Sequence, residues 1–220
     1  MAKRLVAGVL ILCIVCLCAA CGNNASSNTD THSEPAQNEE QIHTEETDSD
    51  SESEAQETVN EKEILIAYFS RTGNTKELAE EISSQIGGEL FEIVPTEPYP
   101  ADYDETVERF RRERDENARP AIANSVEDIT RYDVIFIGFP NWGDDMPHIV
   151  YTFLEQYDFS GKTLVPFCTN GGGGFGNSIA GLNRTCPNSE IAEGFECSGS
   201  RIQNESDNIA EWLGTLGLEE

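Results

Sequence analysis

Apolar residues gather into five short runs in residues 62–220, and a segment with helical spacing follows each run. The runs occupy residues 64–69, 89–94, 133–139, 163–168 and 191–197. Near-continuous apolar strands are typical of a parallel sheet that is buried on both faces, because the intervening helices cover both sides. The pattern therefore predicts an α/β domain built from five βα units.

The first and last helical segments have clear apolar stripes. Leu78, Ile82 and Ile86 recur at four-residue spacing after the first run, and Asn74 or Thr75 can cap the start of this helix. The stripe of the last segment consists of Ile209, Trp212, Leu213 and Leu216. We expect both stripes to pack against the sheet.

The crossover between the second and third runs, residues 95–132, is the longest. It contains a helical segment in which we expect Tyr103, Val107 and Phe110 to face inward. We interpret the charges of this segment as a solvated face, since neighbouring opposite charges stabilise a helix by only a few tenths of a kcal/mol. A phosphate site built from its arginines is an alternative that the interleaved acids disfavour. These arginines are Arg109, Arg111, Arg112 and Arg114.

Residues 1–21 differ from the rest of the chain and are predicted to be a targeting segment. Lys3 and Arg4 precede an apolar stretch from Leu5 to Ala20, and small residues lead to Cys21. The segment resembles the signal of bacterial lipoproteins. This resemblance implies cleavage before Cys21 and attachment of a lipid to that cysteine.

One feature departs from the lipoprotein pattern. Leu17 lies one position further from Cys21 than the usual leucine, and Cys18 takes its place. An uncleaved anchor is the alternative, but sixteen apolar residues are short for a membrane span of about 20 residues. Either interpretation leaves the folded domain outside the cytoplasm, and we expect it to be lipid-anchored to the bacterial cell membrane.

Residues 22–61 contain twelve Asp or Glu residues and no Lys or Arg. Large apolar side chains are almost absent, so this segment cannot bury enough surface to fold. We expect a disordered acidic tether. Recruitment of a basic partner by the acidic residues is an alternative.

Residues 62–220 are long enough for one domain with a sizeable core. They carry 29 acidic and 12 basic residues, a net charge of −17. This excess of negative charge argues against nucleic acid as a partner, because the phosphate backbone would be repelled. It suits solubility or association with basic proteins.

Three cysteines lie in the predicted domain, Cys168, Cys186 and Cys197. Their spacing fits no metal site, and an odd number leaves at least one thiol unpaired within the chain. If a disulfide forms, we expect it between Cys168 and Cys197, which should lie at the same end of neighbouring strands. The alternative is that both are small buried residues.

The loop after the first run, residues 70–75, has the composition of an anion site. Ser70, Thr72 and Thr75 supply hydroxyl groups, and Gly73 allows close approach of the backbone. The N–H groups at the start of the following helix point at the same place. A phosphate is therefore the expected ligand, although an ordinary capped turn is the simpler alternative.

Ligands of an open parallel sheet bind beyond the carboxyl ends of its strands, so the loops after the third and fourth runs also matter. The first of these runs from Gly138 to Pro147 and contains Trp142, and the second contains four successive glycines, residues 171–174.

Together, the three loops make residues 62–220 resemble the flavodoxin family, and more closely its bacterial flavodoxin-like members of similar domain size. The resemblance implies a short-chain, doubly wound five-stranded parallel sheet of order 2-1-3-4-5, with helices on both faces, that binds FMN. The FMN phosphate would be bound by Ser70, Arg71, Thr72, Gly73, Asn74 and Thr75. One edge of the ring would contact Pro140, Asn141, Trp142 and Gly143, and the polar edge would contact Thr169, Gly171, Gly172, Gly173 and Gly174.

Relatives commonly carry a second aromatic residue after Trp142, where this chain has Gly143 and Asp144. Loss of one stacking contact is expected to weaken flavin binding roughly tenfold. Asp144 and Asp145 are adjacent and therefore point apart, so we expect them to tune the redox potential of a flavin rather than to act as acid and base. We assign no catalytic residue and no metal ligand.

The glycines after the fourth run allow another interpretation. Gly171, Gly173 and Gly176, with Glu196 twenty residues on, fit the dinucleotide-binding fingerprint. We discount it because only 44 residues follow Gly176, too few for the further βα units of a dinucleotide fold. Asn177 stands where a Walker loop has lysine, which excludes that motif.

The flavodoxin resemblance implies an electron-transfer protein whose partners are redox proteins or quinones. An NAD(P)H-dependent quinone or flavin reductase on the same fold is the alternative, disfavoured because nicotinamide cofactors are not expected outside the cell. A flavin-free binding module is a third possibility.

Overall fold

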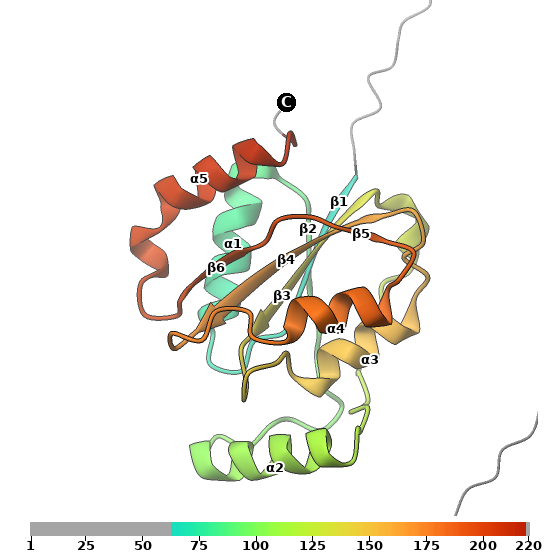
Figure 1. Cartoon of the computed structure of the whole chain (residues 1–220), viewed down its shortest axis with the longest axis vertical. Helices are drawn as coiled ribbons and strands as arrows, with labels where there is room; N and C mark the ends of the chain where they lie inside the picture. The colour runs from blue at the N-terminus through green and yellow to red at the C-terminus, as the bar shows by residue number, and fades with distance from the viewer. Residues whose placement is uncertain (1–62, 219–220) are drawn as a thin grey trace, which may run out of the picture. The chain divides into compact units, whose positions relative to one another are not determined.

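The computed structural model describes residues 63–218, whose strands form one parallel sheet (Figure 1). The strand order is β2-β1-β3-β4-β5, and β6 also pairs with β4. This confirms the predicted order 2-1-3-4-5. The strands are β1 (Ile64–Tyr68), β2 (Glu89–Glu92), β3 (Val134–Pro140), β4 (Thr163–Asn170), β5 (Glu190–Ile191) and β6 (Phe195–Ser198). The helices are α1 (Asn74–Ile86), α2 (Tyr103–Asp115), α3 (His148–Gln156), α4 (Ser178–Thr185) and α5 (Ser206–Thr215).

The predicted signal segment, residues 1–21, and the predicted tether, residues 22–61, lie outside the described residues. Among residues 63–218, no helix has the length and apolar character needed to cross a membrane.

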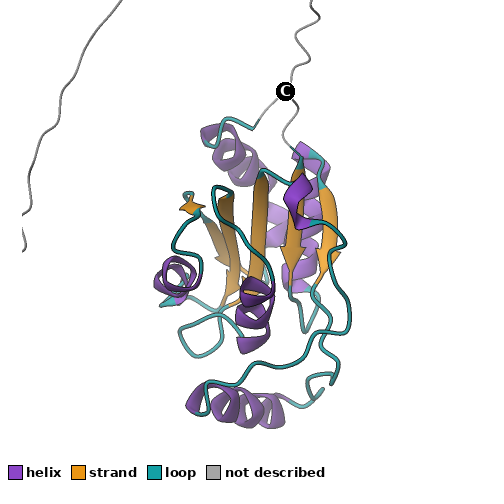
Figure 2. Ribbon diagram, turned by 90° about the vertical axis from the view of Figure 1, so that its right-hand side faces the viewer, coloured by secondary structure: helices purple, strands orange, loops and turns teal. Residues whose placement is uncertain are grey.

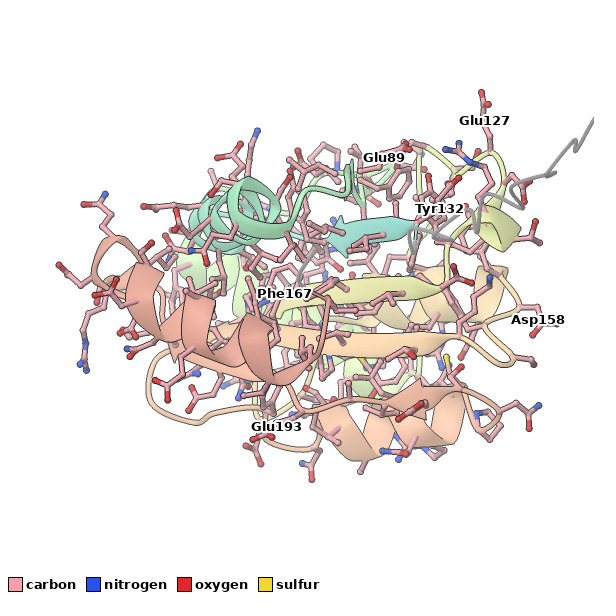
Figure 3. All side chains as sticks on the ribbon, turned by 90° about the horizontal axis from the view of Figure 1, so that it is seen from above. Glu89, Glu127, Tyr132, Asp158, Phe167 and Glu193 are labelled. Carbon is pink, nitrogen blue, oxygen red and sulfur yellow. The ribbon has the colours of Figure 1, made fainter. Side chains whose placement is uncertain are left out.

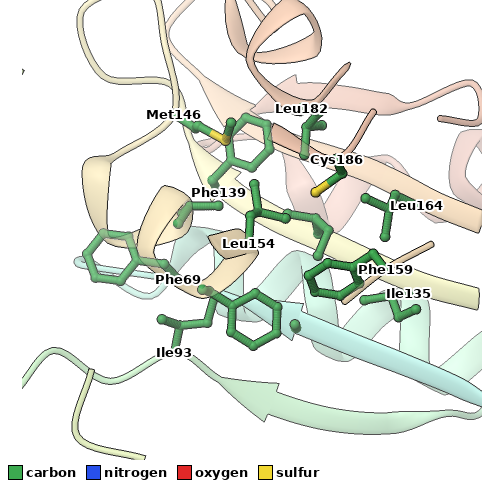
Figure 4. Packing of buried hydrophobic residues seen from close by; sticks show 14 of the residues in the cluster. Phe69, Ile93, Ile135, Phe139, Met146, Leu154, Phe159, Leu164, Leu182 and Cys186 are labelled. Atoms are coloured by element: carbon green, nitrogen blue, oxygen red, sulfur yellow. The ribbon is translucent and has the colours of Figure 1, made fainter. Parts of the chain in front are cut away.

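Helices α1, α5, α3 and α4 cover the two faces of the sheet, as predicted (Figure 2). Ile82 of α1 and Ile209 of α5 pack with Phe136 on one face. Phe153 of α3 and Leu182 of α4 pack on the other face. Figure 4 shows the second cluster, in which side chains from the strands and these two helices interdigitate. The expected stripe of α5 is confirmed, since Ile209, Trp212 and Leu213 are buried.

The predicted fifth strand is wrong in one respect, because residues 191–197 form two short strands, β5 and β6. Ala192 N donates to Leu164 O at 2.9 Å, so the backbone N–H and C=O groups of residue 164 point toward β5. The backbone groups of residue 166, two positions further along β4, point to the same side. Pro166 has no N–H to donate there, and the pairing is interrupted. A Cβ at Gly194 would lie 2.8 Å from Pro166 Cγ, so glycine is needed where the chain passes the proline ring.

The helix of the long crossover, α2, is the exception to the two-layer arrangement. It lies beyond the carboxyl ends of the strands, at the bottom of Figure 1. Its buried residue Phe110 belongs to neither core cluster and packs edge-on against Trp142 at 5.9 Å. The expectation that Tyr103 faces inward is wrong, since its side chain is 72% exposed.

The pairing of Cys168 with Cys197, predicted only for the case that a disulfide forms, does not occur, and the alternative of two small buried residues holds. Thr169, not Cys168, is the register partner of Cys197, so the two cysteine side chains project from opposite faces of the sheet. Cys168 belongs to the core cluster of α3 and α4, and Cys197 to that of α1 and α5. Both are free and buried, as is Cys186.

Candidate functional site

A hollow of about 740 Å³ lies where β1, β3, β4 and β6 end, and α2 forms one of its walls. Such a position, outside the carboxyl ends of parallel strands, is where ligands bind in open α/β sheets. Its volume falls in the range of small-molecule sites.

Ten of the fifteen residues predicted to contact a cofactor line this hollow, so the three loops named from the sequence do meet in space. These ten are Arg71, Thr72, Asn74, Thr75, Pro140, Asn141, Trp142, Gly143, Thr169 and Gly171. The other five, Ser70, Gly73, Gly172, Gly173 and Gly174, are not part of its lining.

The loop before α1 leaves the start of this helix open. The residue that precedes the helix is Gly73, with φ of +95°, and no side chain caps the helix there. The prediction that Asn74 or Thr75 acts as the cap is therefore wrong. Ser70 shapes the loop, because its hydroxyl accepts from Gly73 N at 3.2 Å. The N–H groups of the first helical turn thus lack a side-chain acceptor and suit an anion.

Two buried threonines join this loop to the end of β4. The hydroxyl oxygens of Thr75 and Thr169 lie 2.8 Å apart in a hydrogen bond, and the side chains are 1% and 4% exposed. Because both residues line the hollow, this bond fixes the position of the anion loop relative to the fourth strand.

Arg71 has a role that the motif did not indicate. Its guanidinium donates to the carbonyl oxygens of Pro100 (3.1 Å), Ala101 (2.6 Å) and Asp102 (3.2 Å). These carbonyls belong to the segment that leads into α2. Arg71 therefore ties the anion loop to the α2 wall through its Nε and Nη2 donors.

The orientation of Trp142 is fixed by three other aromatic rings. Its ring stands edge-on to Phe69 at 5.6 Å, to Tyr99 at 5.1 Å and to Phe110 at 5.9 Å. Edge-to-face contacts of this kind are favourable between aromatic rings. Trp142 consequently presents an ordered apolar surface to the hollow.

A tight turn follows Trp142. Trp142 N donates to Asp145 O at 2.8 Å and Asp145 N to Trp142 O at 3.2 Å, while Gly143 and Asp144 have φ of +58° and +71°. This is the type I′ geometry, which favours glycine, asparagine and aspartate. A Cβ at Gly143 would lie 2.6 Å from Phe110 Cε1. Phe110 thus supplies an aromatic ring beside the position where the sequence lacks one.

The loops after β3 and β4 hold each other in place. Asn141 Nδ2 donates to Gly174 O at 2.6 Å, and Asn177 N donates to Asp144 O at 2.8 Å. A Cβ at Gly176 would collide with the Asp144 carbonyl, so glycine is required at this contact. The glycine-rich segment 171–176 therefore holds the two loops together. Of its glycines, only Gly171 lines the hollow.

Asp145 is engaged in the same loop. Its Oδ1 accepts from Met146 N at 2.8 Å and from the Tyr151 hydroxyl at 3.0 Å. Burial and the nearby Asp145 carboxylate raise the pKa of Tyr151 to about 12, which keeps this hydroxyl a donor. Asp145 thus has a structural role, whereas Asp144 is exposed at the tip of the turn.

Sequence reasoning missed several residues of the hollow. The largest group is a stripe of α2 at helical spacing, and the pattern alone could not show that it faces a hollow instead of the sheet. This stripe consists of Tyr103, Thr106, Val107, Phe110, Arg111 and Arg114. Asn170, Ser198, Gly199 and Ser200 complete the lining. In the described part of the chain, no cluster of three His, Cys, Asp or Glu residues could hold a metal ion.

Comparison with known proteins places residues 63–216 in a family. Residues 63–216 match the family model described as flavodoxin. Among curated proteins, none matches the chain.

Three solved structures are similar over nearly their whole length. A flavoprotein from Bacteroides eggerthii is 40% identical, with a TM-score of 0.58, over 67% of this chain and 98% of that one. One from Bacteroides uniformis is 31% identical, with a TM-score of 0.63, over 70% and 98%. A flavoprotein from Lactobacillus acidophilus in complex with FMN is 26% identical, with a TM-score of 0.57, over 68% and 99%.

Proposed function

Because the chain belongs to the flavodoxin family, we propose that it binds FMN in the hollow and carries electrons with it. A relative from Lactobacillus acidophilus has been crystallised with FMN. Bound FMN supplies a centre that accepts and releases one or two electrons. The residues described above determine how such a cofactor is held.

The convergence of three loops on one hollow is the observation that carries this proposal. The uncapped start of α1 and the hydroxyls of Thr72 and Thr75 suit the phosphate group. Trp142 offers an ordered aromatic surface for the ring. Thr169 and Gly171 lie at the end of β4, where backbone groups can contact the polar edge.

Titration of the purified apo-protein with FMN, followed by visible absorption, tests the binding. Stepwise anaerobic reduction of the loaded protein then tests the electron-transfer role. An electron carrier is expected to accumulate the one-electron-reduced flavin and to oxidise NADH and NADPH slowly. Rapid steady-state oxidation of either nucleotide with a quinone acceptor would instead identify a reductase and overturn the carrier role.

For the location of the protein, we propose export and anchoring by a lipid on Cys21. The support comes from the sequence of residues 1–21 and from the acidic residues 22–61. A lipid-anchored domain would exchange electrons with membrane redox proteins or quinones. Cys21→Ala is expected to move the protein from the membrane fraction to the soluble fraction, and an unchanged distribution would refute the lipid anchor.

A further inference from the structure

One face of α2 is turned to the hollow along the full length of the helix. Its lining residues follow the helical repeat from the first turn to the last. They begin with Tyr103 and end with Arg114, and Thr106 and Phe110 between them are buried. In the described structure this helix therefore forms a wall of the site, instead of covering the sheet as the other helices do.

The cations on this wall differ from those elsewhere around the site. Arg71 is engaged by three carbonyl oxygens, and Arg109 is held by Glu113 at 2.7 Å and by two carbonyl oxygens. Arg111, in contrast, makes no hydrogen bond or ion pair within residues 63–218. Arg114 pairs only with its neighbour Asp115, and both side chains are at least half exposed. An exposed pair of this kind contributes little stability.

Two arginines of the α2 wall thus line the hollow without a buried counter-ion, in a domain that carries excess negative charge. Arginine binds carboxylate, sulfonate and phosphate groups through its planar fork of N–H donors. The two arginines lie in the second half of α2, whereas the proposed phosphate loop lies at the start of α1. The two anion-binding elements therefore belong to different walls.

An aromatic surface adjoins the arginines. Phe110 and Trp142 line the hollow, and Tyr103 at the start of α2 lies at its exposed margin, 72% accessible to solvent. An aromatic surface that adjoins guanidinium groups suits a flat ring system that carries an acidic group, because rings stack and the charge pairs.

We propose that the α2 wall is a second subsite, which binds a small aromatic molecule with a negatively charged group and orients it by Arg111 and Arg114. Redox-active molecules of this class would lie against the cofactor. The subsite rests on the proposed function, since it assigns the phosphate loop to FMN and leaves the α2 wall for the second ligand.

The test compares two ring-matched probes, anthraquinone-2-sulfonate and the neutral 2-(hydroxymethyl)anthraquinone, by calorimetric titration of the oxidised, FMN-loaded protein. The wild type is expected to bind the sulfonate at least tenfold more tightly than the neutral probe. Arg111→Gln with Arg114→Gln should remove this preference and leave the affinity for the neutral probe within about twofold. The preference should also weaken as ionic strength rises.

Arg112→Gln is the matched control, because Arg112 lies between the other two on the same helix, is exposed, and is not part of the lining. It removes one positive charge, as each substitution of the double variant does, and should leave both affinities unchanged. An equal loss in this control would show that only the general charge of α2 matters and would overturn the subsite. Equal affinity of the wild type for the two probes would also overturn the subsite.

Titration of each variant with FMN and with riboflavin separates this subsite from the proposed function. Unchanged affinities are expected for both flavins. If the double variant lost FMN affinity but kept riboflavin affinity, the arginines would hold the FMN phosphate and the second subsite would be wrong. If the wild type bound no FMN, the proposed function would fail. Titration of the purified protein with the sulfonate would still test the subsite. The subsite is supported only if the double variant loses affinity for the sulfonate and Arg112→Gln does not.

Discussion

At the scale of single residues, the hydrogen bond between Thr75 and Thr169 joins the proposed phosphate loop to the end of β4. Each hydroxyl is buried, so the loss of one partner leaves the other with an unsatisfied polar group. The sequence did not show that these two hydroxyls bond to each other. The motif identified Thr75 as a donor, but not the residue that positions it.

Thr169→Val keeps the side-chain shape and removes this bond. We expect FMN affinity to fall about tenfold, which corresponds to the ~1 to 1.5 kcal/mol of one buried hydrogen bond. Riboflavin affinity should fall less, because the bond acts through the phosphate loop. Thr152→Val, which removes a hydroxyl bonded to Pro120 O outside the hollow, is the control. Equal losses for the two flavins would contradict a role through the phosphate.

Asp144 is suited to a test of electrostatic tuning, since it lies at the exposed tip of the turn after Trp142. Asparagine tolerates its positive φ of +71°, so Asp144→Asn should preserve the turn. A carboxylate about 10 Å from a reduced, anionic flavin, in a dielectric near 40, repels it by roughly 0.8 kcal/mol, or about 35 mV.

The midpoint potential for the second electron should therefore rise in Asp144→Asn by a few tens of millivolts, roughly the magnitude just given. Asp133→Asn removes the same charge at the amino end of β3 and should leave the potential unchanged. A redox titration in which the two variants behave alike would contradict local tuning by Asp144.

The three buried thiols are expected to make the stability of the fold depend on pH in the alkaline range. Burial raises the pKa of Cys168 from 9.0 to about 12, and that of Cys186 and Cys197 to about 11. The folded state therefore holds these protons more tightly than the unfolded state does. Their contribution to stability is complete below pH 9 and is lost as pH rises toward 11 and 12.

Chemical denaturation should accordingly give a free energy of unfolding that decreases between pH 9 and pH 11. Alkylation at pH 8 should leave all three thiols unmodified in the folded protein and modify all three in denaturant. A thiol that stayed unreactive in denaturant without reductant would indicate a disulfide and contradict the two-face arrangement of Cys168 and Cys197.

At the scale of elements, the strands and the five helices could be predicted because apolar runs and helical stripes report burial directly. The position of α2 as a wall of the hollow could not be predicted. Its stripe of Tyr103, Val107 and Phe110 has the same spacing as a stripe that packs on a sheet, and spacing does not identify the surface that it faces. The break between β5 and β6 was missed for another reason, since Pro166 lies on the neighbouring strand.

The contact between the loops after β3 and β4 is tested by Gly176→Ala. Gly176 has φ of +53°, and an added Cβ would meet the backbone of Asp144. Gly174→Ala is the matched control, because Gly174 has a similar φ of +57° but open space around its Cβ position. The left-handed conformation alone costs about 1 to 2 kcal/mol in either variant.

We expect Gly176→Ala to lower the free energy of unfolding by more than this amount, and to weaken FMN binding, because the collision separates the two loops. Gly174→Ala should show the conformational cost alone. Denaturant unfolding and FMN titration measure both effects. If the two variants lost stability equally, the loops would not be held by this contact.

At the scale of the whole molecule, acidic side chains such as Glu127, Asp158 and Glu193 project from different sides of the domain (Figure 3). The net charge of −17 for residues 62–220 still argues against nucleic acid as a partner. Against this background, the two arginines of α2 that line the hollow are a local exception. Composition showed the overall charge, but only the fold showed where the cations gather.

The central claim is that the hollow at the carboxyl ends of the strands holds FMN by its phosphate and its ring. The most direct measurement is a titration of the purified apo-protein with FMN and, separately, with riboflavin, followed by quenching of flavin fluorescence. The account predicts one FMN per chain and clearly weaker binding of riboflavin, which lacks the phosphate. Absence of FMN binding, or equal affinity for the two flavins, would contradict it.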